Sequence, residues 1–308
     1  MSKQAVKEKF APPTVTLAEL PAVIVEPLRE EQRAEVLTFL AARPVHTVFM
    51  VSMIHDNGLV SPLNRGTFYG CRDEIGHLQG VALIGHATLM EARTPAALAA
   101  FSRVAQTCIT THVMMGEQER LEKFWEIYAE QGQALRLLCR ELLIEQRWPI
   151  EAQEAVPNLR HATVDDLPYL IPVNAQMVFE ECGLNPVETD PEGFRERLAR
   201  RIAQGRVWVW IEDEELIFKV DIISDAQDVV YLEGTYVAPE HRGKGFGRRC
   251  MLQLSRHLLQ RASSVCLLVN DQNNCAQAFY RKVGFKVLAS YDTIYLQREK
   301  AKKMSASA

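Results

Sequence analysis

The chain has 308 residues, and its 35 lysines and arginines against 39 acidic residues give a formal charge of −4. With 47% hydrophobic and 24% charged residues, the composition is that of an ordinary globular protein, which excludes a largely disordered, collagenous or coiled-coil chain. The length suggests two domains, and the mildly acidic balance argues against nucleic acid as a dedicated partner.

Apolar runs and cysteine spacing exclude several further classes. No stretch approaches the roughly 18 consecutive apolar residues of a membrane-spanning helix, and the first residues lack the apolar core of a signal peptide. The seven cysteines form no C-x-x-C pair, and the eight histidines form no H-E-x-x-H pair. We therefore expect a cytoplasmic protein with reduced thiols, no metal site and no membrane partner.

The first half of the chain predicts alternating helices and strands. Residues 1–21 are polar and contain two adjacent prolines, so we expect a flexible leader. Hydrophobic periodicity then predicts a domain over residues 22–148. The expected helices are 30–42, 95–106 and 117–131, the expected strands are 68–72, 79–89 and 108–114, and 135–144 fits either type.

The second half predicts a mixed sheet. A proline-bounded acidic segment at 149–157 marks the expected linker, the second domain spans 158–298, and 299–308 form a tail that we expect to fray. Short connections between successive strands predict an antiparallel meander, and the element order is α+β. The expected strands are 158–163, 207–211, 216–223, 229–237, 265–269, 285–289 and 293–296, and the expected helices are 163–182, 190–203, one reaching about 262, and 273–283.

A glycine-rich loop follows the strand 229–237. It has three glycines in five residues, Gly243, Gly245 and Gly247, and residues 240–261 carry a net charge of +5. Glycines let a backbone approach a ligand closely, and the free N–H groups at a helix start attract anions. The loop matches neither the Walker A pattern nor the dinucleotide fingerprint. Two readings remain, a phosphate-binding loop and a tight turn that begins a helix.

Two motifs resemble those of the GNAT superfamily of acetyl-CoA-dependent N-acetyltransferases. The segment Arg242-Gly243-Lys244-Gly245-Phe246-Gly247 fits the family's R/Q-x-x-G-x-G/A loop, and Asn273 to Phe285 fit its N-x-x-A-x-x-L/F-Y-x-x-x-G-F pattern. The resemblance implies a GNAT fold for 158–298, a central mixed, mostly antiparallel sheet flanked by helices. The element order of 22–148 resembles the cofactor-less domain of tandem GNAT proteins, although no motif confirms it.

The resemblance also implies how acetyl-CoA is bound. The pyrophosphate would lie on the N–H groups of residues 242–247, and strand 229–237 would part from strand 265–270 to admit the pantetheine arm. Asn273 would lie near the thioester or begin the next helix as its N-cap. The implied cofactor-binding residues are Thr235, Tyr236, Val237, Arg242, Gly243, Lys244, Gly245, Phe246, Gly247, Arg248, Asn270, Asn273 and Tyr280.

The implied reaction is direct attack of a neutral amine on the thioester, through a tetrahedral intermediate. Tyr280 holds the family's general-acid position, with a core aromatic beside Phe279 as the alternative, and the Val237 N–H is the candidate oxyanion donor. Glu233 is the candidate base because a carboxylate in an apolar strand is anomalous. A water chain, or pairing of Glu233 with an arginine, is the alternative. Strand alternation places Glu233 on one face with Val237, unless a bulge intervenes.

The acceptor stays open at this stage. A primary amine of a small molecule or peptide is implied, and a non-catalytic acyl-CoA sensor or transfer of another acyl group are the alternatives. A second copy of the chain is a candidate partner. The first half is a candidate to cover the sheet, shape the acceptor cleft or form a dimer. The aromatic candidates for an acceptor pocket are Phe179, Trp208, Trp210 and Tyr236, with the core as the alternative location for the tryptophans.

Overall fold

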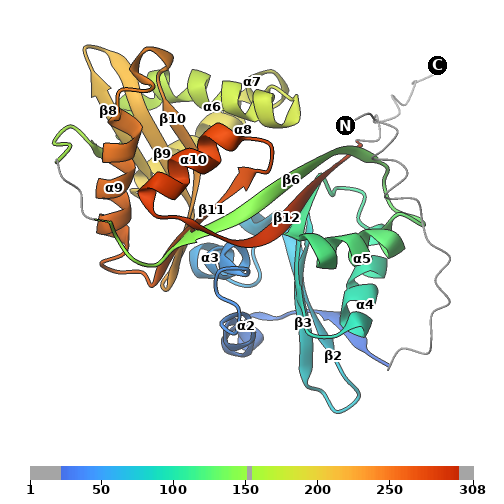
Figure 1. Cartoon of the computed structure of the whole chain (residues 1–308). Coiled ribbons are helices and arrows are strands. Elements are labelled where there is room, and N and C mark those ends of the chain that lie inside the picture. Colours follow the sequence, from blue (N-terminus) through green and yellow to red (C-terminus); the bar gives the residue numbers. More distant parts are fainter. Residues whose placement is uncertain (1–21, 151–154, 298–308) are drawn as a thin grey trace, which may run out of the picture. The chain divides into compact units, whose positions relative to one another are not determined.

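The computed structural model describes residues 22–150 and 155–297 (Figure 1). The expected leader, the expected tail and residues 151–154 of the expected linker lie outside the described residues.

The chain forms two compact units, and each draws on both halves of the sequence. Unit 1 contains the described chain up to Phe39, Asn57–Cys139 and the residues from Asp292, whereas unit 2 contains Leu40–Asp56 and Arg140–Tyr291. Strands β6 (Leu135–Gln146) and β12 (Lys286–Leu296) each begin in one unit and end in the other. The two units are therefore interleaved along the chain.

Unit 1 has a sheet in which β1 to β4 are antiparallel neighbours and β4 runs parallel to β5. Its strands, in spatial order, are β1 (Ile24–Pro27), β2 (Gly66–Arg72), β3 (Leu78–Gly85), β4 (Ala87–Ala92), β5 (Val113–Glu117) and the end of β12. Helices α4 (Pro95–Gln106) and α5 (Gln118–Tyr128) pack on this sheet through Phe101, Phe124 and Tyr128. A short 3₁₀ turn, Glu30–Gln32, leads into α2 (Arg33–Leu40).

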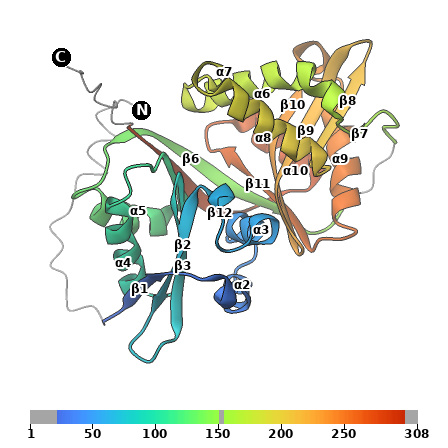
Figure 2. The ribbon, with the colours of Figure 1, turned by 180° about the vertical axis from the view of Figure 1, so that it is seen from behind.

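Unit 2 has a similar plan, in which β10 and β11 run parallel and the pairs β6–β11, β10–β9, β9–β8 and β8–β7 are antiparallel. Its strands, in spatial order, are the end of β6, β11 (Ser264–Asn270), β10 (Val229–Val237), β9 (Glu215–Ala226), β8 (Val207–Glu212) and β7 (Arg160–His161). Helices α9 (Phe246–Leu258) and α10 (Asn274–Val283) cover one face, as Figure 1 shows. Helices α6 (Leu167–Cys182) and α8 (Pro191–Ala203) cover the other, seen in Figure 2 beside the short α7 (Pro186–Thr189).

Helix α3 (Val48–Asn57) comes from the first half of the chain and packs within unit 2. The ring of Phe49 lies 4.4 Å from that of Tyr231, and the Ser52 hydroxyl accepts a hydrogen bond from the Asp225 N–H at 3.0 Å. Arg206 donates two hydrogen bonds to the carboxylate of Asp56, at 2.5 and 2.8 Å. The first half of the sequence thus supplies a helix to the second.

Several predicted elements are confirmed in detail. Helix α4 and strand β10 have the predicted bounds, and 135–144 is a strand. Helix α6 ends at Gly183 in the left-handed conformation, and the Asp190 carboxylate caps α8 by accepting from the Gly193 N–H at 3.1 Å. These elements have strong local start and stop signals, which is why their sequences suffice.

Other expectations are wrong. The segment 79–89 is a hairpin of β3 and β4, and the two strands expected at 285–289 and 293–296 are the single strand β12. Helices α3 and α7 were not predicted. The buried residues of α3, Val48, Met50, Ser52 and Ile54, alternate along the sequence because the helix is covered on two sides, so no single apolar stripe marks it.

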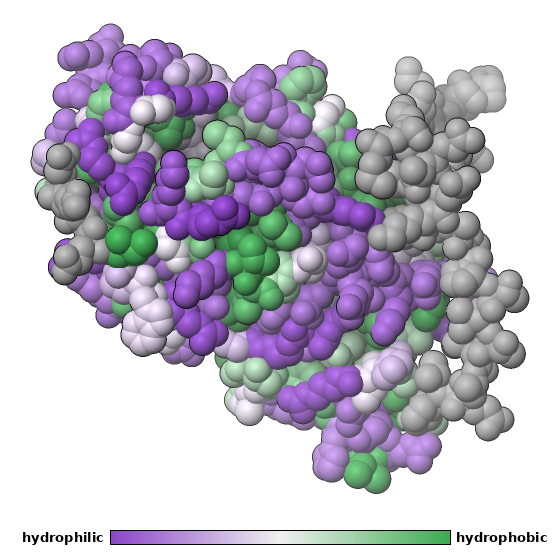
Figure 3. Space-filling view, in the orientation of Figure 1, coloured by the Kyte–Doolittle hydropathy of each residue, from purple (hydrophilic) through white to green (hydrophobic). Residues whose placement is uncertain are grey.

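In the space-filling view, hydrophilic side chains cover most of the visible face, with smaller apolar patches between them (Figure 3). Within residues 22–150 and 155–297, no helix is long and apolar enough to cross a membrane. None of the seven cysteines, all of them in the described part of the chain, forms a disulfide.

The interleaving predicts that residues 155–297 do not fold as an independent fragment. Without β6, strand β11 loses its antiparallel neighbour from Val265 to Asn270, and an unpaired edge favours aggregation. We expect the fragment to be insoluble or oligomeric alone, and soluble when co-expressed with residues 22–150. Circular dichroism and size-exclusion chromatography would measure this, and a monomeric fragment with a cooperative thermal transition would contradict it.

Candidate active site

Strands β10 and β11 are paired over only three residue pairs. The pairs run from Val229–Ser264 to Tyr231–Cys266, after which β10 continues to Val237 and β11 to Asn270. The parting of strands that the GNAT resemblance implies is therefore present. It leaves backbone groups on the two inner edges, where an extended ligand can add in the manner of a strand.

Strand β10 also carries a β-bulge, where its register with β9 shifts between Glu233 and Tyr236 and Gly234 has φ +62°. In a regular strand, Leu232 and Tyr236 would share a face. Here Leu232 and Val237 pack with the core under α9 and α10, whereas Tyr236 packs with the core under α6 and α8. The bulge that the sequence left open is therefore present, and it places Glu233 and Val237 on opposite faces instead of on the one face that regular alternation gives.

A buried lysine lies beside the bulge. Lys219 of β9 is inaccessible to solvent, and its Nζ donates hydrogen bonds to Asn174 Oδ1 and, at 3.0 Å, to Asp221 Oδ2. Arg201 Nη1 lies 3.1 Å from the same Asp221 oxygen. The partners offset part of the large free-energy cost of burying the ammonium.

Sequence reasoning missed this polar cluster, Asn174, Arg201, Lys219 and Asp221. The available signal was the one that identified Glu233, since Lys219 and Asp221 are charged residues inside an otherwise apolar strand. The network also constrains the bulge, because a Cβ at Gly234 would lie only 2.8 Å from Lys219 Nζ.

Glu233 reaches solvent, yet surrounding protein crowds its carboxyl group closely enough to desolvate it. This desolvation, reinforced by the negative charge of Glu181, raises the pKa of Glu233 to about 7, while Arg201 acts in the opposite direction. A carboxyl group with that pKa can accept a proton and release it again near neutral pH.

Tyr280 of α10 is buried, with its ring centroid 5.0 Å from that of Phe279 and 5.6 Å from that of Phe285. Desolvation raises the pKa of its phenol, so the hydroxyl keeps its proton at neutral pH. The neighbouring Thr235 opposes part of this shift, although its own Oγ1 makes no hydrogen bond of good geometry within the described residues. The ring of Tyr280 is therefore a core aromatic, as the alternative prediction has it, while its hydroxyl interacts with Thr235 of the bulge.

The glycine loop ends in an uncapped helix start. Gly243 and Gly245 have φ of +73° and +85°, with open space where a side chain would lie, and Gly245 is the N-cap of α9 with no side-chain cap. The N–H groups of the first turn of α9 have no acceptor within the helix. Arg242, Lys244 and Arg248 are exposed here, and Arg242 Nε donates to the Val237 carbonyl at 2.9 Å. The donor set fits a pyrophosphate.

The corresponding helix start in unit 1 is built differently. Strands β4 and β5 are parallel neighbours over the two pairs Ala87–Val113 and Thr88–Met114, and α4 follows β4. The Thr94 hydroxyl caps α4 by accepting from the Ala97 N–H at 3.2 Å, and Pro95 removes one donor. Between these two helix starts, that of α9 is therefore the better anion site.

The remaining candidates have structural contacts. Asn273 caps α10, since its Oδ1 accepts from the Ala276 N–H at 3.0 Å, and Asn270 Oδ1 accepts from the Gln272 N–H at 2.9 Å. Trp210 belongs to the core, and its ring centroid lies 5.1 Å from that of Phe246. The ring centroid of Trp208 lies 4.0 Å from that of His161. The tryptophans thus follow the core alternative. Phe179 is half exposed on α6.

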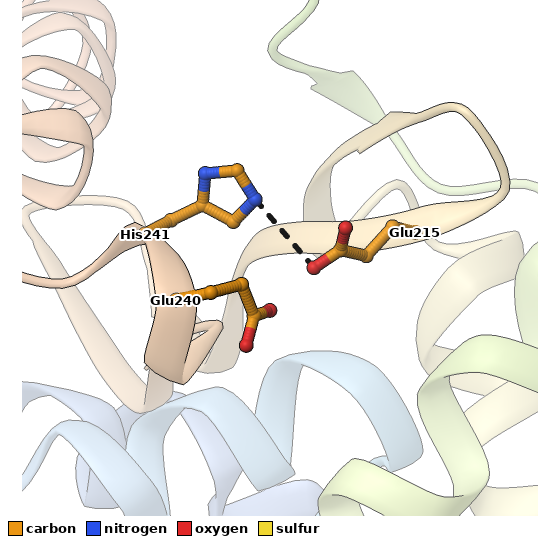
Figure 4. Close-up of side chains that lie close together, drawn as sticks. All are labelled: Glu215, Glu240 and His241. Carbon is orange, nitrogen blue, oxygen red and sulfur yellow. Dashed lines mark ion pairs between the residues drawn. The ribbon is translucent and has the colours of Figure 1, made fainter.

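Figure 4 shows a cluster beside the loop, in which Glu215 of β9 approaches Glu240 and His241. The candidate ligand atoms all lie within 4.8 Å of one another, and His241 Nε2 is 3.5 Å from Glu215 Oε1. A hydrogen bond between the two carboxyl groups raises the pKa of Glu215 and lowers that of Glu240. The cluster ties the start of β9 to the loop, and these exposed groups alone do not define a metal site.

Known proteins match both the sequence and the fold. The model of the acetyltransferase (GNAT) family matches residues 175–285. A UPF0039 protein of Schizosaccharomyces pombe is 30% identical over 118 residues, which are 38% of this chain and 72% of that protein. The chain belongs to the GNAT family.

Two further relatives bear the name peptidyl-lysine N-acetyltransferase YjaB. The Salmonella typhimurium protein is 28% identical over 86 residues, 28% of this chain and 54% of that protein. The Escherichia coli protein is 40% identical over 57 residues, 18% of this chain and 36% of that protein. The chain spans about half or less of the length of these relatives.

Solved structures extend the likeness to nearly the whole chain. A Drosophila protein has a TM-score of 0.65 at 13% identity, covering 91% of this chain and 100% of that one. A tandem GNAT protein from the clavulanic acid biosynthesis pathway has a TM-score of 0.56 at 14% identity, with the same coverage. At such identities the likeness concerns the fold. The α+β expectation is confirmed, and both units have the GNAT fold.

The bulge predicts the effect of replacing Gly234 by alanine. A side chain there meets Lys219 Nζ and requires a left-handed backbone, so we expect Gly234→Ala to lower stability by about 1–3 kcal/mol and to reduce turnover more than tenfold. Gly183→Ala is the matched control, because Gly183 has φ +71° with open space around it. Thermal unfolding and steady-state kinetics measure both variants, and equal losses in the two would contradict the role of the lysine contact.

Proposed function

We propose that the chain is an N-acetyltransferase that moves an acetyl group from acetyl-CoA to a primary amine of a small molecule or peptide. The observation that carries this proposal is the combination of the uncapped, glycine-rich start of α9 with the parted strands β10 and β11. Glu233 lies in the bulge of β10, and Tyr280 of α10 interacts with Thr235 of the same bulge. In the GNAT family such a combination accompanies use of acetyl-CoA.

The proposed binding follows from where backbone donors are available. The first-turn N–H groups of α9 hold the pyrophosphate, with Lys244 and Arg248 adding positive charge. The edge of β10 from Thr235 to Val237 binds the pantetheine arm by strand addition. Arg242 holds the end of this edge in place through its bond to the Val237 carbonyl.

The proposed chemistry uses two proton transfers. Glu233 takes a proton from the acceptor ammonium, directly or through water, and the amine nitrogen then forms a bond to the thioester carbon. The Val237 N–H is our candidate donor to the oxyanion of the tetrahedral intermediate. As the C–S bond breaks, its electron pair stays on sulfur, and Tyr280 supplies a proton there. The buried, protonated state of Tyr280 supports this role.

Charge around the base supports a cationic acceptor. Besides Glu233 itself, Glu141, Glu181 and Asp221 place three negative charges near this carboxyl group, against the two positive charges of Arg201 and Lys219. Because two relatives are named peptidyl-lysine N-acetyltransferases, a lysine side chain in a peptide is the first acceptor to test. Transfer of another acyl group, or acyl-CoA sensing without turnover, are the competing proposals.

We propose that unit 2 is the catalytic unit and that unit 1 acts without a cofactor loop of its own. The capped start of α4 supports this division. A cytoplasmic location and a partnership with a second copy of the chain remain predictions from the sequence.

The general-acid role predicts that Tyr280→Phe lowers kcat about 10²–10³-fold, since proton transfer by a positioned side chain contributes on that order. The dissociation constant for acetyl-CoA should change less than threefold, because the ring stays in the core. Thiol release and calorimetry measure the two quantities. Unchanged kcat in a variant that still binds acetyl-CoA would contradict the general-acid role of Tyr280 and would require another proton donor to the sulfur.

The base role predicts a pH profile. Glu233 accepts a proton only when it is ionised, so kcat/KM should fall as the pH drops through about 7 and level off above that value. Glu233→Gln should lower kcat/KM at least tenfold and remove this inflection. Persistence of the same inflection in the variant would assign it to another group.

One experiment tests the whole proposal. Isothermal titration of the full chain with acetyl-CoA is followed by thiol detection across peptides containing lysine, polyamines, amino acids and aminoglycosides. Binding with amine-dependent thiol release is expected. Absence of binding overturns the proposal, and binding without release to any acceptor favours the sensor.

A further inference from the structure

The opening between β10 and β11 raises the question of what keeps these two strands apart. In a parallel pair, evenly spaced hydrogen bonds join the two strands along the length over which they are paired. Here both strands continue beyond Tyr231 and Cys266, yet the shared ladder stops. We infer that Tyr231 is a positioning residue, a spacer whose hydroxyl holds β11 away from β10 and thereby sets the width of the acetyl-CoA opening.

The hydroxyl of Tyr231 occupies the place of a backbone acceptor. The N–H of Leu268, two residues beyond the last pair on β11, donates to Tyr231 Oη at 3.3 Å. This N–H points toward β10, where a continuing ladder would offer a main-chain carbonyl. Because the phenol oxygen lies a side chain's length from the β10 backbone and accepts this hydrogen bond, the strands separate without leaving the partly buried Leu268 N–H unpaired.

Helix α3 holds the spacer in position. Tyr231 is 4% exposed, and the ring of Phe49 packs against it at 4.4 Å with an interplanar angle of 52°. Helix α3 is fastened near this contact by Ser52, which accepts from the Asp225 N–H, and by Asp56, which pairs with Arg206. The segment Leu40–Asp56 thus has a role in unit 2, as a brace for the spacer.

The inference rests on the proposed function only in that acetyl-CoA is taken to occupy the opening. Glu233 and Tyr280 are the proposed reacting groups, whereas Tyr231 acts through the backbone. Its removal should therefore affect KM and the dissociation constant for acetyl-CoA more than kcat.

The test compares two Tyr→Phe variants in the full chain. Tyr231→Phe removes the spacer's acceptor, and Tyr128→Phe removes a hydroxyl that likewise accepts a backbone N–H, that of Gln133 at 3.2 Å, in unit 1. Tyr128 is also fully buried, so the two changes match in burial and in the lost bond.

We expect Tyr231→Phe to weaken acetyl-CoA binding about tenfold, the ratio that corresponds to the net free energy of one hydrogen bond. Its kcat at saturation should change less than threefold, and its Tm should fall less than that of Tyr128→Phe, because Leu268 can pair with β10 once the spacer is gone. Tyr128→Phe should keep wild-type affinity. Hydrogen exchange at residues 267–269 should slow in Tyr231→Phe.

Wild-type affinity in Tyr231→Phe, or faster exchange at residues 267–269, overturns the inference. If Tyr231→Phe does not fold, Phe49→Leu replaces it, and unchanged acetyl-CoA affinity there is the contradicting result. If the wild-type chain fails to bind acetyl-CoA, the proposed function fails, and the exchange measurement alone decides whether Tyr231 separates the strands.

Discussion

The short pairing of β10 with β11 is the constraint on which the site depends. Three residue pairs join the strands, and beyond them each strand has an inner edge that its neighbour does not use. The bulge, the glycine loop and Tyr280 all lie at or after this point along the chain. A sheet that closed fully would bury the same backbone groups in its ladder and leave no edge to which an extended ligand could add.

The charged side chains buried beside the bulge carry a free-energy cost, which their partners partly offset. Lys219 and Asp221 are buried charges, and burial of an ion is unfavourable unless it is paired and hydrogen-bonded. Asn174 and Arg201 supply pairing from the helices above, although Asp221 Oδ1 and Asn174 Nδ2 have no hydrogen-bond partner in the described parts of the chain. Such incompletely satisfied polar groups beside a proposed acceptor site suit a place where a ligand arrives.

The sequence predicted those parts of the site that depend on patterns of a few neighbouring residues. The glycine loop, strand β10 and the Asn273-capped helix α10 were predictable because turn, alternation and capping signals act over a few residues. The placement of Glu233 was not, since one inserted residue exchanges the two faces of a strand and leaves no mark on composition.

The tertiary contacts could not be predicted from the sequence, for a different reason. The cluster around Lys219 draws on three elements, with Asn174 from α6, Asp221 from β9 and Arg201 from α8. The contact between Phe49 and Tyr231 likewise joins residues far apart in the sequence. Helix α3 lacks an apolar stripe because two of its sides are covered. Strands β6 and β12 each pass from one unit into the other, and this arrangement likewise depends on pairing between residues that lie far apart in the sequence.

The passage of β6 and β12 between the units has a consequence for synthesis on the ribosome. Unit 1 includes its early strands and also Leu296 and Gln297, which donate to the carbonyls of His112 and Ala134. Its sheet cannot be completed until the last described strand has emerged, which is on the order of ten seconds after β5 at typical translation rates. Helix α3 must wait similarly for β10. The nascent chain therefore carries unfinished sheet edges for most of its elongation, and we expect its yield to depend on chaperones that cover them.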